Sequence, residues 1–409
     1  MNTQLRKDAE IIARAAIEAV KPDAAVERAL GGMHFPGDVF LVAAGKAAWQ
    51  MAKAALDCLS VPVQGVVVTK YGHVQGELPG VTCYEAGHPV PDENSFLGTR
   101  AALALTENLK PTDTVLFLLS GGGSALFEDP VISGAELQNI TKQLLACGAD
   151  ITQINTIRKR LSRVKGGRFA QWCAPARVEA VVLSDVLGDP LDMIASGPAA
   201  ADQTTCADAL AIAKQYDLHL SEAAVTCLHT ETPKELTNVH TQVIGSVKEL
   251  CRAAAQEAEK LGYTPVYLTD YLTCEARQAG SFLASILRSH AADGKKLAYL
   301  AGGETVVHLT GTGLGGRNQE LALSAAAQIE GLSNVCLLSV GSDGTDGPTD
   351  AAGGYADGDT MDALRQHGLQ LEAVLAENDA YHALQAVDGL IFTGPTGTNV
   401  NDVAIGLIG

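Results

Sequence analysis

Two glycine-rich segments of the chain have the composition of phosphate-binding loops. The segment TGTGLGGRNQE (310–320) carries Gly311, Gly313 and Gly316 in the spacing G-x-G-x-x-G. A dinucleotide-binding turn with this spacing also needs a preceding strand, a following helix and an acidic residue about 20 positions later. No Asp or Glu ends the next strand at the required place, so the segment favours a phosphate cradle at a helix start. Its predicted ligands are Gly315, Gly316 and the guanidinium of Arg317.

The second segment, SGGGSA (120–125), follows the apolar run TVLFLL (114–119). Free backbone N–H groups in such a turn can bind an anion where the next helix begins. The alternative is a tight turn that only glycine can form, and the segment lacks the lysine of a Walker A loop. The phosphate ligands predicted in this segment are Ser120, Gly121, Gly122, Gly123 and Ser124.

A basic cluster interrupts an otherwise acidic chain at NTIRKRLSRVKGGR (155–168). The cluster is either a solvated helix face or a positively charged wall that attracts an anionic substrate. In the second case Arg158 and Lys165 are the predicted anion ligands, and Lys165 is expected to turn inward where the helix ends.

Paired carboxylates follow two of the apolar runs. Asp185 and Asp189 come just after VVLS, and Asp343 and Asp346 come just after LLSV. Carboxylates in such loops suit Mg²⁺, which binds one or two of them together with substrate phosphates. One of them could instead accept a proton from a substrate hydroxyl, or cap a helix or turn. We expect Asp343 and Asp346 to bind the metal, and Asp185 and Asp189 are the candidates for the base.

The composition restricts the class of ligand. The chain has 409 residues, 47% of them hydrophobic, and a formal net charge of −18. This charge argues against nucleic acid, which is bound mainly through basic residues. No apolar run approaches the roughly 18 residues of a membrane helix, and nine cysteines without a C-x-x-C pair are typical of reduced thiols. We therefore expect a cytoplasmic protein that binds small molecules.

The candidate residues follow predicted β-strands. Apolar, β-branched runs alternate with Ala-rich helical segments, a pattern that predicts mostly parallel sheets flanked by helices. Ligands of such sheets lie beyond the carboxyl ends of the strands. The strands are expected at 38–45, 63–69, 81–87, 113–123, 178–186, 240–246, 264–270, 296–310, 334–344 and 389–395.

The chain is long enough for two α/β domains. The polar stretch HTETPKELTNVHTQ (229–242) is the best boundary between them. We therefore expect an N-terminal domain over 1–237 and a smaller C-terminal domain over 238–409.

Six motifs, LLSGGGSAL, INTIRKRLSRVKGGR, LSDVLGDPLDMIASGP, GGRNQELAL, GSDGTDGPTDAAGG and TGPTGTNVNDV, occur in this order along the chain. They resemble the signature segments of the glycerate 2-kinase family, the glycerate kinases with a C-terminal MOFRL domain. The resemblance runs from AAGKAAWQMA (43–52) to residue 406. It implies a Rossmann-like N-terminal domain and an active site in the cleft between the domains.

The resemblance also implies a reaction and its residues. The reaction is ATP-dependent phosphorylation of D-glycerate to 2-phosphoglycerate with Mg²⁺. The catalytic residues it implies are Lys46 of AAGKAA, one of Asp185 and Asp189 in the SDVLGD segment, preferably Asp189, and Arg317 of GGRNQE. Asn399 is added as a substrate or phosphate ligand. The expected partners are D-glycerate and ATP, with neither nucleic acid nor membrane, and a second copy of the chain in a homodimer.

Three other functions stay open from the sequence. The first is an NAD(P)H-dependent hydroxypyruvate reductase, because relatives have carried that name and G-x-G-x-x-G is present. The second is a kinase of a related small hydroxy acid. The third is a binding protein without catalysis. The kinase interpretation uses every loop described above, whereas the reductase interpretation uses one.

Overall fold

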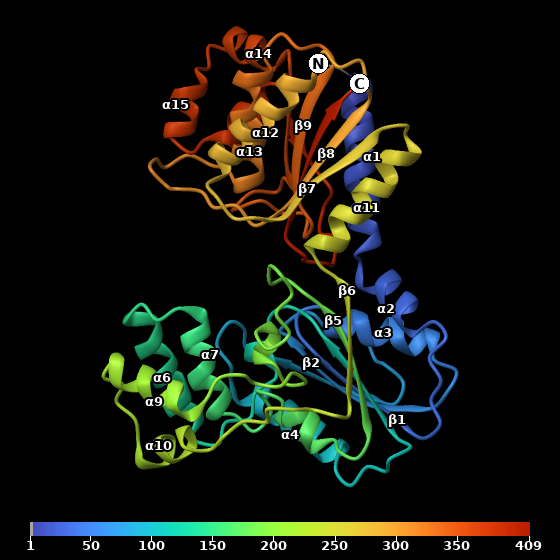
Figure 1. The fold of residues 1–409 in the computed structure, drawn as a ribbon, viewed down its shortest axis with the longest axis vertical. Helices are drawn as coiled ribbons and strands as arrows, with labels where there is room; N and C mark the ends of the chain where they lie inside the picture. Colours follow the sequence, from blue (N-terminus) through green and yellow to red (C-terminus); the bar gives the residue numbers. More distant parts are fainter. Residues whose placement is uncertain (1–2) are drawn as a thin grey trace. The chain divides into compact units, whose positions relative to one another are not determined.

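The computed structural model describes residues 3–409, which form two compact units. One unit spans Pro22–Ile244, and the other joins the residues before Pro22 to Gly245–Gly409 (Figure 1). Each unit consists of a six-stranded sheet with helices packed against it. None of the helices in the described part of the chain is long and apolar enough to cross a membrane.

The sheet of the Pro22–Ile244 unit has the strand order β3-β2-β1-β4-β5-β6. Its registered pairs, β1 with β2 and β4, β2 with β3, and β4 with β5, are all parallel. The strands are β1 (Val39–Ala44), β2 (Val63–Lys70), β3 (Val81–Ala86), β4 (Thr114–Leu119), β5 (Arg177–Leu183) and β6 (Val239–Gly245). This is the order of the doubly wound dinucleotide-binding folds, in which ligands bind where the strand order reverses, here between β1 and β4.

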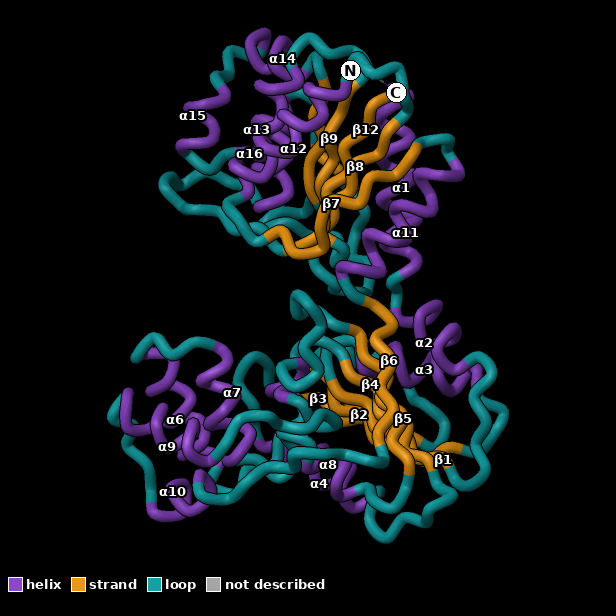
Figure 2. The backbone as a smooth tube through the Cα atoms, in the orientation of Figure 1, coloured by secondary structure: helices purple, strands orange, loops and turns teal. Residues whose placement is uncertain are grey.

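The central strands of this sheet are apolar on both faces because helices cover both. Every residue of β4 is buried, as expected for a strand inside a parallel sheet. The helices are α2 (Pro22–Leu30), α3 (Ala48–Cys58), α4 (Glu93–Leu105), α5 (Gly123–Leu126), α6 (Gly134–Ala146), α7 (Ile151–Arg160), α8 (Arg168–Trp172), the 3₁₀ turn η1 (Ile194–Ser196), α9 (Cys206–Gln215) and α10 (Glu222–Leu228). Helices α6, α7, α9 and α10 form a separate group with its own apolar core (Figure 2).

The sheet of the other unit has the order β11-β10-β9-β12-β8-β7. Its strands are β7 (Thr264–Leu272), β8 (Leu297–Gly303), β9 (Val335–Gly341), β10 (Gly353–Asp357), β11 (Leu390–Ile391) and β12 (Asp402–Ile408). Strand β12 runs antiparallel to both β8 and β9, and β10 runs antiparallel to β9 and β11, whereas β7 and β8 are parallel. The sheet is therefore mixed, with β7, β8, β9 and β11 pointing one way.

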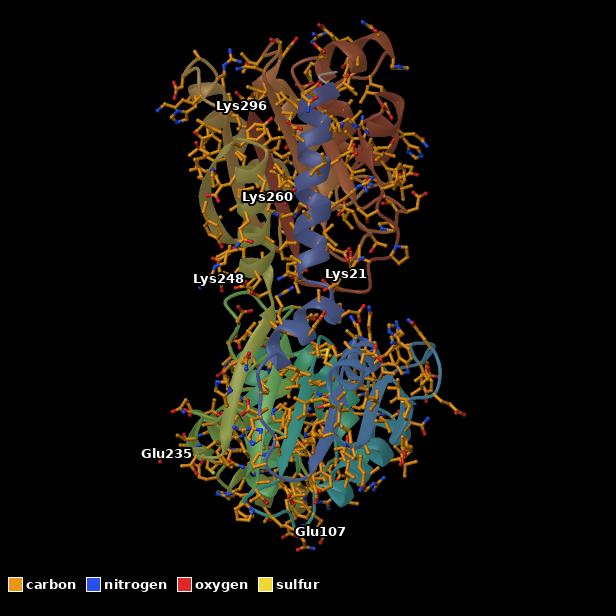
Figure 3. The ribbon with its side chains drawn as sticks, turned by 90° about the vertical axis from the view of Figure 1, so that its right-hand side faces the viewer. Lys21, Glu107, Glu235, Lys248, Lys260 and Lys296 are labelled. Atoms are coloured by element: carbon orange, nitrogen blue, oxygen red, sulfur yellow. The ribbon has the colours of Figure 1, made fainter. Side chains whose placement is uncertain are left out.

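Seven helices complete this unit: α1 (Thr3–Ala19), α11 (Val247–Lys260), α12 (Ala276–His290), α13 (Arg317–Ile329), α14 (Thr360–Gln366), α15 (Leu371–Ala376) and α16 (Ala380–Ala386), counted over residues 3–409. Helix α1 contacts α11, β9 and β12 (Figure 3, α1 in blue; Lys260 marks the end of α11). Leu5, Ile12 and Ile17 are among its buried residues. The carboxylate of Asp8 accepts a hydrogen bond from the Tyr263 hydroxyl at 2.8 Å.

These units differ from the expected ranges 1–237 and 238–409. The N-terminal helix packs in the C-terminal unit, because its apolar face covers the far-away strands β9 and β12. The segment 240–246, expected in the second domain, forms edge strand β6 of the first sheet. The sequence analysis also missed β10 and β12. The five residues of β10, GGYAD, show no clear period, and β12, DVAIGLI, is a continuous apolar run that periodicity alone does not assign to a strand.

Candidate active site

The loops after β1 and β4 are hydrogen-bonded to each other where the strand order reverses. The amide of Lys46 donates to the carbonyl of Gly121 at 2.9 Å, and the amide of Ala47 donates to the Ser120 hydroxyl at 3.0 Å. Gly45 has φ +130°, and a Cβ there would lie 2.2 Å from Ser120 Oγ. Glycine is therefore required for this close approach. These hydrogen bonds place Lys46 against the predicted phosphate loop 120–124.

The loop 120–124 keeps several backbone N–H groups available. Within residues 3–409, the amides of Gly121, Gly122 and Ser124 donate to no protein acceptor. The short helix α5 follows directly, and its N-cap Gly122 has φ 84°. Unpaired amides that point out of such a turn are the groups that bind phosphate oxygens. Three amides of this loop are therefore available to an anion, and phosphate binding there stays a prediction.

The glycines of the loop have no side chain, so groups from other segments can approach the backbone closely. A Cβ on Gly121 would lie 2.1 Å from Asp185 Oδ2, and one on Gly122 would lie 3.0 Å from His88 and 3.2 Å from Lys46 Cγ. Burial, together with the nearby lysines Lys46 and Lys70, lowers the pKa of His88 below its usual value. Asp185 thus lies close to Gly121, and His88 and Lys46 lie close to Gly122.

Asp185 and Asp189 both follow β5 but have different surroundings. Asp185 lies against Gly121 of the phosphate loop. Asp189 has φ 52°, and its buried Oδ1 accepts no hydrogen bond from the described residues. A left-handed conformation and an unpaired buried oxygen are both unfavourable, so surrounding structure must hold Asp189 in place. Of the two aspartates, Asp185 is the one that touches the loop.

The basic segment lies beneath the loop and not on a solvated face. The guanidinium of Arg158 donates to the carbonyl of Ser124 at 2.9 Å, and the ammonium of Lys165 donates to the same carbonyl at 2.8 Å. Lys165 also bonds to the carbonyl of Phe127 at 3.0 Å, and the fully buried Glu128 lies 3.5 Å from its Nζ. Lys165 does turn inward, but the expected positive wall is an internal support of the loop.

Burial of this cluster changes the pKa of Lys165. Lys165 is fully buried, and the loss of solvent lowers its pKa to about 8, although Glu128 opposes that shift. The buried ion pairs satisfy charges that would otherwise be strongly unfavourable in the interior. Arg158 and Lys165 therefore fix the position of the Ser124 carbonyl.

A second turn supports the loop from its other side. Ala195 and Ser196 have φ 52° and 60°, a left-handed conformation that non-glycine residues rarely adopt. The Ser196 hydroxyl lies 3.0 Å from the Ser124 hydroxyl and donates to Asn155 Oδ1 at 3.0 Å. Strain of this kind is usually found where a functional site fixes the backbone.

In the other unit, four backbone amides of the G-x-G-x-x-G segment donate hydrogen bonds to the segment 377–379 of the same chain. The amides of Thr310 and Gly311 both donate to Asn378 Oδ1, the amide of Gly313 donates to the Glu377 carbonyl, and that of Leu314 donates to an Asp379 carboxylate oxygen. A Cβ on Gly311 would lie 2.3 Å from Glu377 Cα. The first glycines therefore serve close packing on the segment 377–379, and the amides of Gly311 and Gly313 are not available to a ligand. Phosphate binding by Gly315 and Gly316, which were the predicted ligands, stays a prediction.

Helix α13 begins directly after this segment, and Asp346 caps it. Asp346 Oδ1 accepts from the amide of Asn318 at 3.1 Å, and Oδ2 accepts from the amide of Gln319 at 2.8 Å. A Cβ on Gly316 would lie 2.3 Å from Asp346 Cγ, so Gly316 permits this contact. Burial raises the pKa of Asp346 to about 6. The helix-capping role that the sequence left open for this aspartate is the one that its hydrogen bonds describe.

Arg317, the first residue of α13, has a carboxylate partner that the sequence analysis missed. Its Nε donates to Asp402 Oδ2 at 2.5 Å and its Nη2 donates to Asp402 Oδ1 at 3.0 Å. Glu304 lies 3.4 Å from Nη1. The paired bond fixes the guanidinium plane, while about a third of the side chain stays exposed.

Asp343 and Asn399 lie in two loops that are bonded to each other. The amide of Val400 donates to the Ser342 hydroxyl at 2.8 Å, and the amide of Thr396 donates to the Asp343 carbonyl. Asp343 is half-buried, and its Oδ1 accepts from the amide of Thr345 at 3.0 Å. Among residues 3–409 there is no group of three or more His, Cys, Asp or Glu side chains that could hold a metal ion. A metal at Asp343 would therefore depend on ligands from a bound substrate.

Sequence comparison assigns the chain to a family. Residues 8–229 match a family described as a domain of unknown function, DUF4147, and residues 297–402 match the MOFRL family. A Thermotoga maritima protein named D-glycerate 2-kinase is 52% identical over 411 residues, which cover 99% of this chain and 98% of that one. The chain belongs to the glycerate 2-kinase family. A Pyrococcus horikoshii protein named glycerate 2-kinase is 45% identical over 389 residues, covering 91% and 88% of the two chains.

Within the glycerate 2-kinase family, the fold is also known from solved structures. The crystal structure of the T. maritima glycerate kinase matches this chain with a TM-score of 0.95 at 52% identity, covering 99% of this chain and all of that one. The predicted α/β architecture of two helix-flanked sheets is thereby confirmed. One Agrobacterium vitis relative, 41% identical over 388 residues that cover 91% of this chain and 100% of that one, is named a putative hydroxypyruvate reductase.

The site residues of this family member fall into two sets, one in each unit. The first unit brings together Lys46, the loop 120–124 and Asp185, with Arg158 and Lys165 beneath them. The second unit joins Gly316, Arg317 and Asp346 at the start of α13. His88 and Asp402 were missed, although both stand in loops at strand ends, in AGHPVPD and TGPTGTNVND, which was the available signal.

Proposed function

We propose that the protein is an ATP-dependent glycerate 2-kinase, which transfers the γ-phosphoryl group of ATP to the 2-hydroxyl of D-glycerate and releases 2-phosphoglycerate and ADP. The observation that supports this most directly is the set of three unpaired amides in the loop 120–124, flanked by Lys46 and Asp185. Phosphoryl transfer depends mainly on positioning and on charge neutralisation, which such a set supplies. The relatives named glycerate 2-kinase support the choice of acceptor.

In this proposal each group has one role. The amides of Gly121, Gly122 and Ser124 bind phosphate oxygens, and the Lys46 ammonium neutralises the charge that builds up there. The Asp185 carboxylate accepts the proton of the 2-hydroxyl as its oxygen attacks phosphorus. Arg317, with its plane fixed by Asp402, is a further cation for a phosphoryl group or the substrate carboxylate.

Magnesium belongs to the proposal through its usual place on the phosphates of ATP. Asp343 fits it better than Asp346, because Asp343 is half-buried and gives one oxygen to a single amide, whereas both oxygens of Asp346 cap α13. Bound there, the ion would neutralise the phosphate oxygens of the nucleotide. Asn399 would support the loop that carries Asp343 and contact the substrate.

The reductase alternative has less support in the site. A nicotinamide dinucleotide would need the amides of the G-x-G-x-x-G turn, which are bonded to the segment 377–379. A long segment also separates Gly303 at the end of β8 from the start of α13, whereas a dinucleotide turn joins strand and helix tightly. We also place the enzyme in the cytoplasm, which the nine free cysteines favour.

The test of this function is a product assay with the intact protein. Incubation with ATP, Mg²⁺ and D-glycerate should release ADP and yield 2-phosphoglycerate, distinguished from the 3-phospho isomer by phosphorus NMR. A parallel reaction with NADH and hydroxypyruvate should leave NADH unchanged. Oxidation of NADH at a comparable rate, with ATP left intact, would refute the kinase assignment.

A further inference from the structure

A cavity of about 660 Å³ lies in the Pro22–Ile244 unit, outside the loops described above. The end of α7, the segment that follows it, helix α8 and the end of α10 enclose it (these helices are labelled in Figure 2). Its volume is in the range of small-molecule sites. The side chains that give it its chemical character are Arg160, Arg163, Arg168, Trp172, Cys227 and Glu231.

The lining of this cavity is basic in a chain with a net charge of −18. Arg160 is fully buried and is held by Thr204 and Glu231, yet its Nε has no acceptor among the described residues. Arg163 is half exposed, and among the described residues its side chain bonds to Asp129 alone, through Nη1 at 2.9 Å. Arg160 and Arg163 are thus each paired with a carboxylate, and a third arginine in the lining can attract an anion.

Arg168 adds donors that the protein leaves unused. Its Nη1 donates to the carbonyls of Lys159, Arg160 and Ser162, while within residues 3–409 its Nη2 and Nε have no acceptor and it forms no ion pair. Burial lowers the pKa of its guanidinium from the ordinary value. A planar guanidinium with two adjacent free donors matches the oxygens of a phosphate.

Two large apolar side chains, Trp172 and Val131, also line the cavity. Trp172 is 46% exposed although its Nε1 is already bonded to the carbonyl of Leu103, so part of the ring remains uncovered. Val131 is 43% exposed. Large apolar groups with this much exposure next to basic side chains suit a ligand with a flat or apolar body and an anionic end.

We propose that this cavity is a second ligand site, which binds a small aromatic or heterocyclic phosphate with its phosphate at Arg163 and Arg168 and its ring against Trp172. Its walls connect to the loop 120–124 through the chain itself. Arg158, which holds Ser124, and Arg160, which lines the cavity, lie on the same helix, and Asp129 of the segment after α5 pairs with Arg163. Binding in the cavity does not depend on the kinase activity.

Phenyl phosphate is a suitable probe because it carries the two features of the proposed ligand, an aromatic ring and a phosphate, without a nucleoside. The chain has two tryptophans, and Trp49 is buried on α3. In a Trp49→Phe background, the fluorescence of Trp172 should change saturably with phenyl phosphate. Inorganic phosphate and phenol, each carrying one of the two features, should bind at least tenfold more weakly. Equal binding of phenol would mean that the arginines play no part, which overturns the proposal.

Two matched pairs of variants locate the site in the same background. Arg163→Gln should weaken binding about tenfold or more, whereas Arg100→Gln, which removes the other cation near Asp129 but lies outside the cavity, should leave it unchanged. Val131→Asp should abolish binding by repulsion, whereas Val225→Asp, an exposed valine on α10 outside the lining, should not.

A second readout keeps the result decisive if one variant folds poorly. Phenyl phosphate should slow alkylation of Cys227, followed by peptide mass spectrometry, but not that of the exposed Cys147. Absence of both a saturable fluorescence change and protection of Cys227, up to millimolar phenyl phosphate, would show that the cavity is not such a site.

Discussion

Asp185 and Asp189 stand four residues apart but differ in what their carboxylates touch. Asp185 lies against Gly121, whereas Asp189 has a buried oxygen without a partner in the described residues. If Asp185 accepts the hydroxyl proton, Asp185→Asn should lower kcat by roughly 10²-fold or more, within the range for loss of a general base. Asp189→Asn, the matched control, should stay within a few-fold of the parent.

Nucleotide binding measured by calorimetry should survive in both aspartate variants, since the loop amides are unchanged. Full turnover in both would move the base elsewhere, with Asp343 as the next candidate. A large loss in Asp189→Asn alone would reverse the assignment in favour of the aspartate that the sequence pattern preferred.

Arg317 provides a second prediction about a single side chain. Lysine keeps the charge but cannot form the paired bonds that Arg317 makes to Asp402. Arg317→Lys should therefore lower kcat by about 10²-fold, the effect of losing one group that stabilises transition-state charge. Arg277→Lys, which alters another ion-paired arginine of the same unit, should leave the rate unchanged. A near-normal kcat/KM for Arg317→Lys would reduce this residue to a structural role.

Asp346 should make stability depend on pH. Burial raises its pKa to about 6 in the folded protein, from an ordinary 3.8. Because the folded state binds the proton more tightly, this group stabilises the fold fully below about pH 4, and the contribution disappears as pH rises through 6. The free energy of unfolding of the parent minus that of Asp346→Asn should fall over this range by up to about 3 kcal/mol. Urea titrations at pH 4.5, 5.5 and 7 measure it, and a flat difference would contradict the raised pKa.

At the scale of elements, the two glycine-rich segments show that the same composition can serve two purposes. In the loop 120–124 three amides stay unpaired, whereas in 310–314 four amides are bonded to the protein. The difference depends on the neighbouring segment. The segment 377–379 accepts hydrogen bonds from the amides of 310–314. In contrast, the loop 120–124 has the side chains of Asp185, His88 and Lys46 close to its glycines.

The first loop should therefore not tolerate a methyl group at Gly121. A Cβ there would lie 2.1 Å from Asp185 Oδ2, so Gly121→Ala must displace the aspartate or the loop. We expect turnover to fall by about 10²-fold, because small displacements of positioned groups are costly. Gly31→Ala is the control, since the nearest atoms would be 3.5 Å away. Equal rates for the two variants would show that the contact does not matter for catalysis.

At the scale of the whole molecule, helix α1 belongs to the same unit as Gly245–Gly409, although it precedes the Pro22–Ile244 unit in the sequence. Helix α1 packs on α11, β9 and β12, and the chain then builds the Pro22–Ile244 unit before it returns. Stability of the second unit should therefore depend on residues at the beginning of the chain.

Ile12→Ala tests this arrangement. Ile12 is fully buried in α1, and its truncation should cost about 2–4 kcal/mol. Hydrogen exchange should show faster exchange in β9, β12 and α11, with β1 and β4 unchanged. Faster exchange of β1 and β4 instead would assign α1 to the N-terminal unit.

The sequence by itself determined the α/β class, the family and the glycine turn at 120–124. Alternating apolar runs and helical segments are local patterns, and SGGGSA needs only its own glycines to form a turn after β4. Strand-end loops could also be located, because parallel strands present their carboxyl ends on one edge. For these features the information lies within short stretches of chain.

The tertiary structure decided which of the candidate groups remain available for a ligand. Asn378 occupies the amides of the G-x-G-x-x-G segment, and Asp346 caps α13, contacts between residues 28 or more positions apart that no local pattern records. Likewise the sequence left open whether the basic cluster is a solvated face or an anion-attracting wall, whereas Arg158 and Lys165 are buried and bond to the Ser124 carbonyl, because a helix face is defined only by what packs on it. The central position of β12 in its sheet has the same origin, since strand pairing joins distant segments.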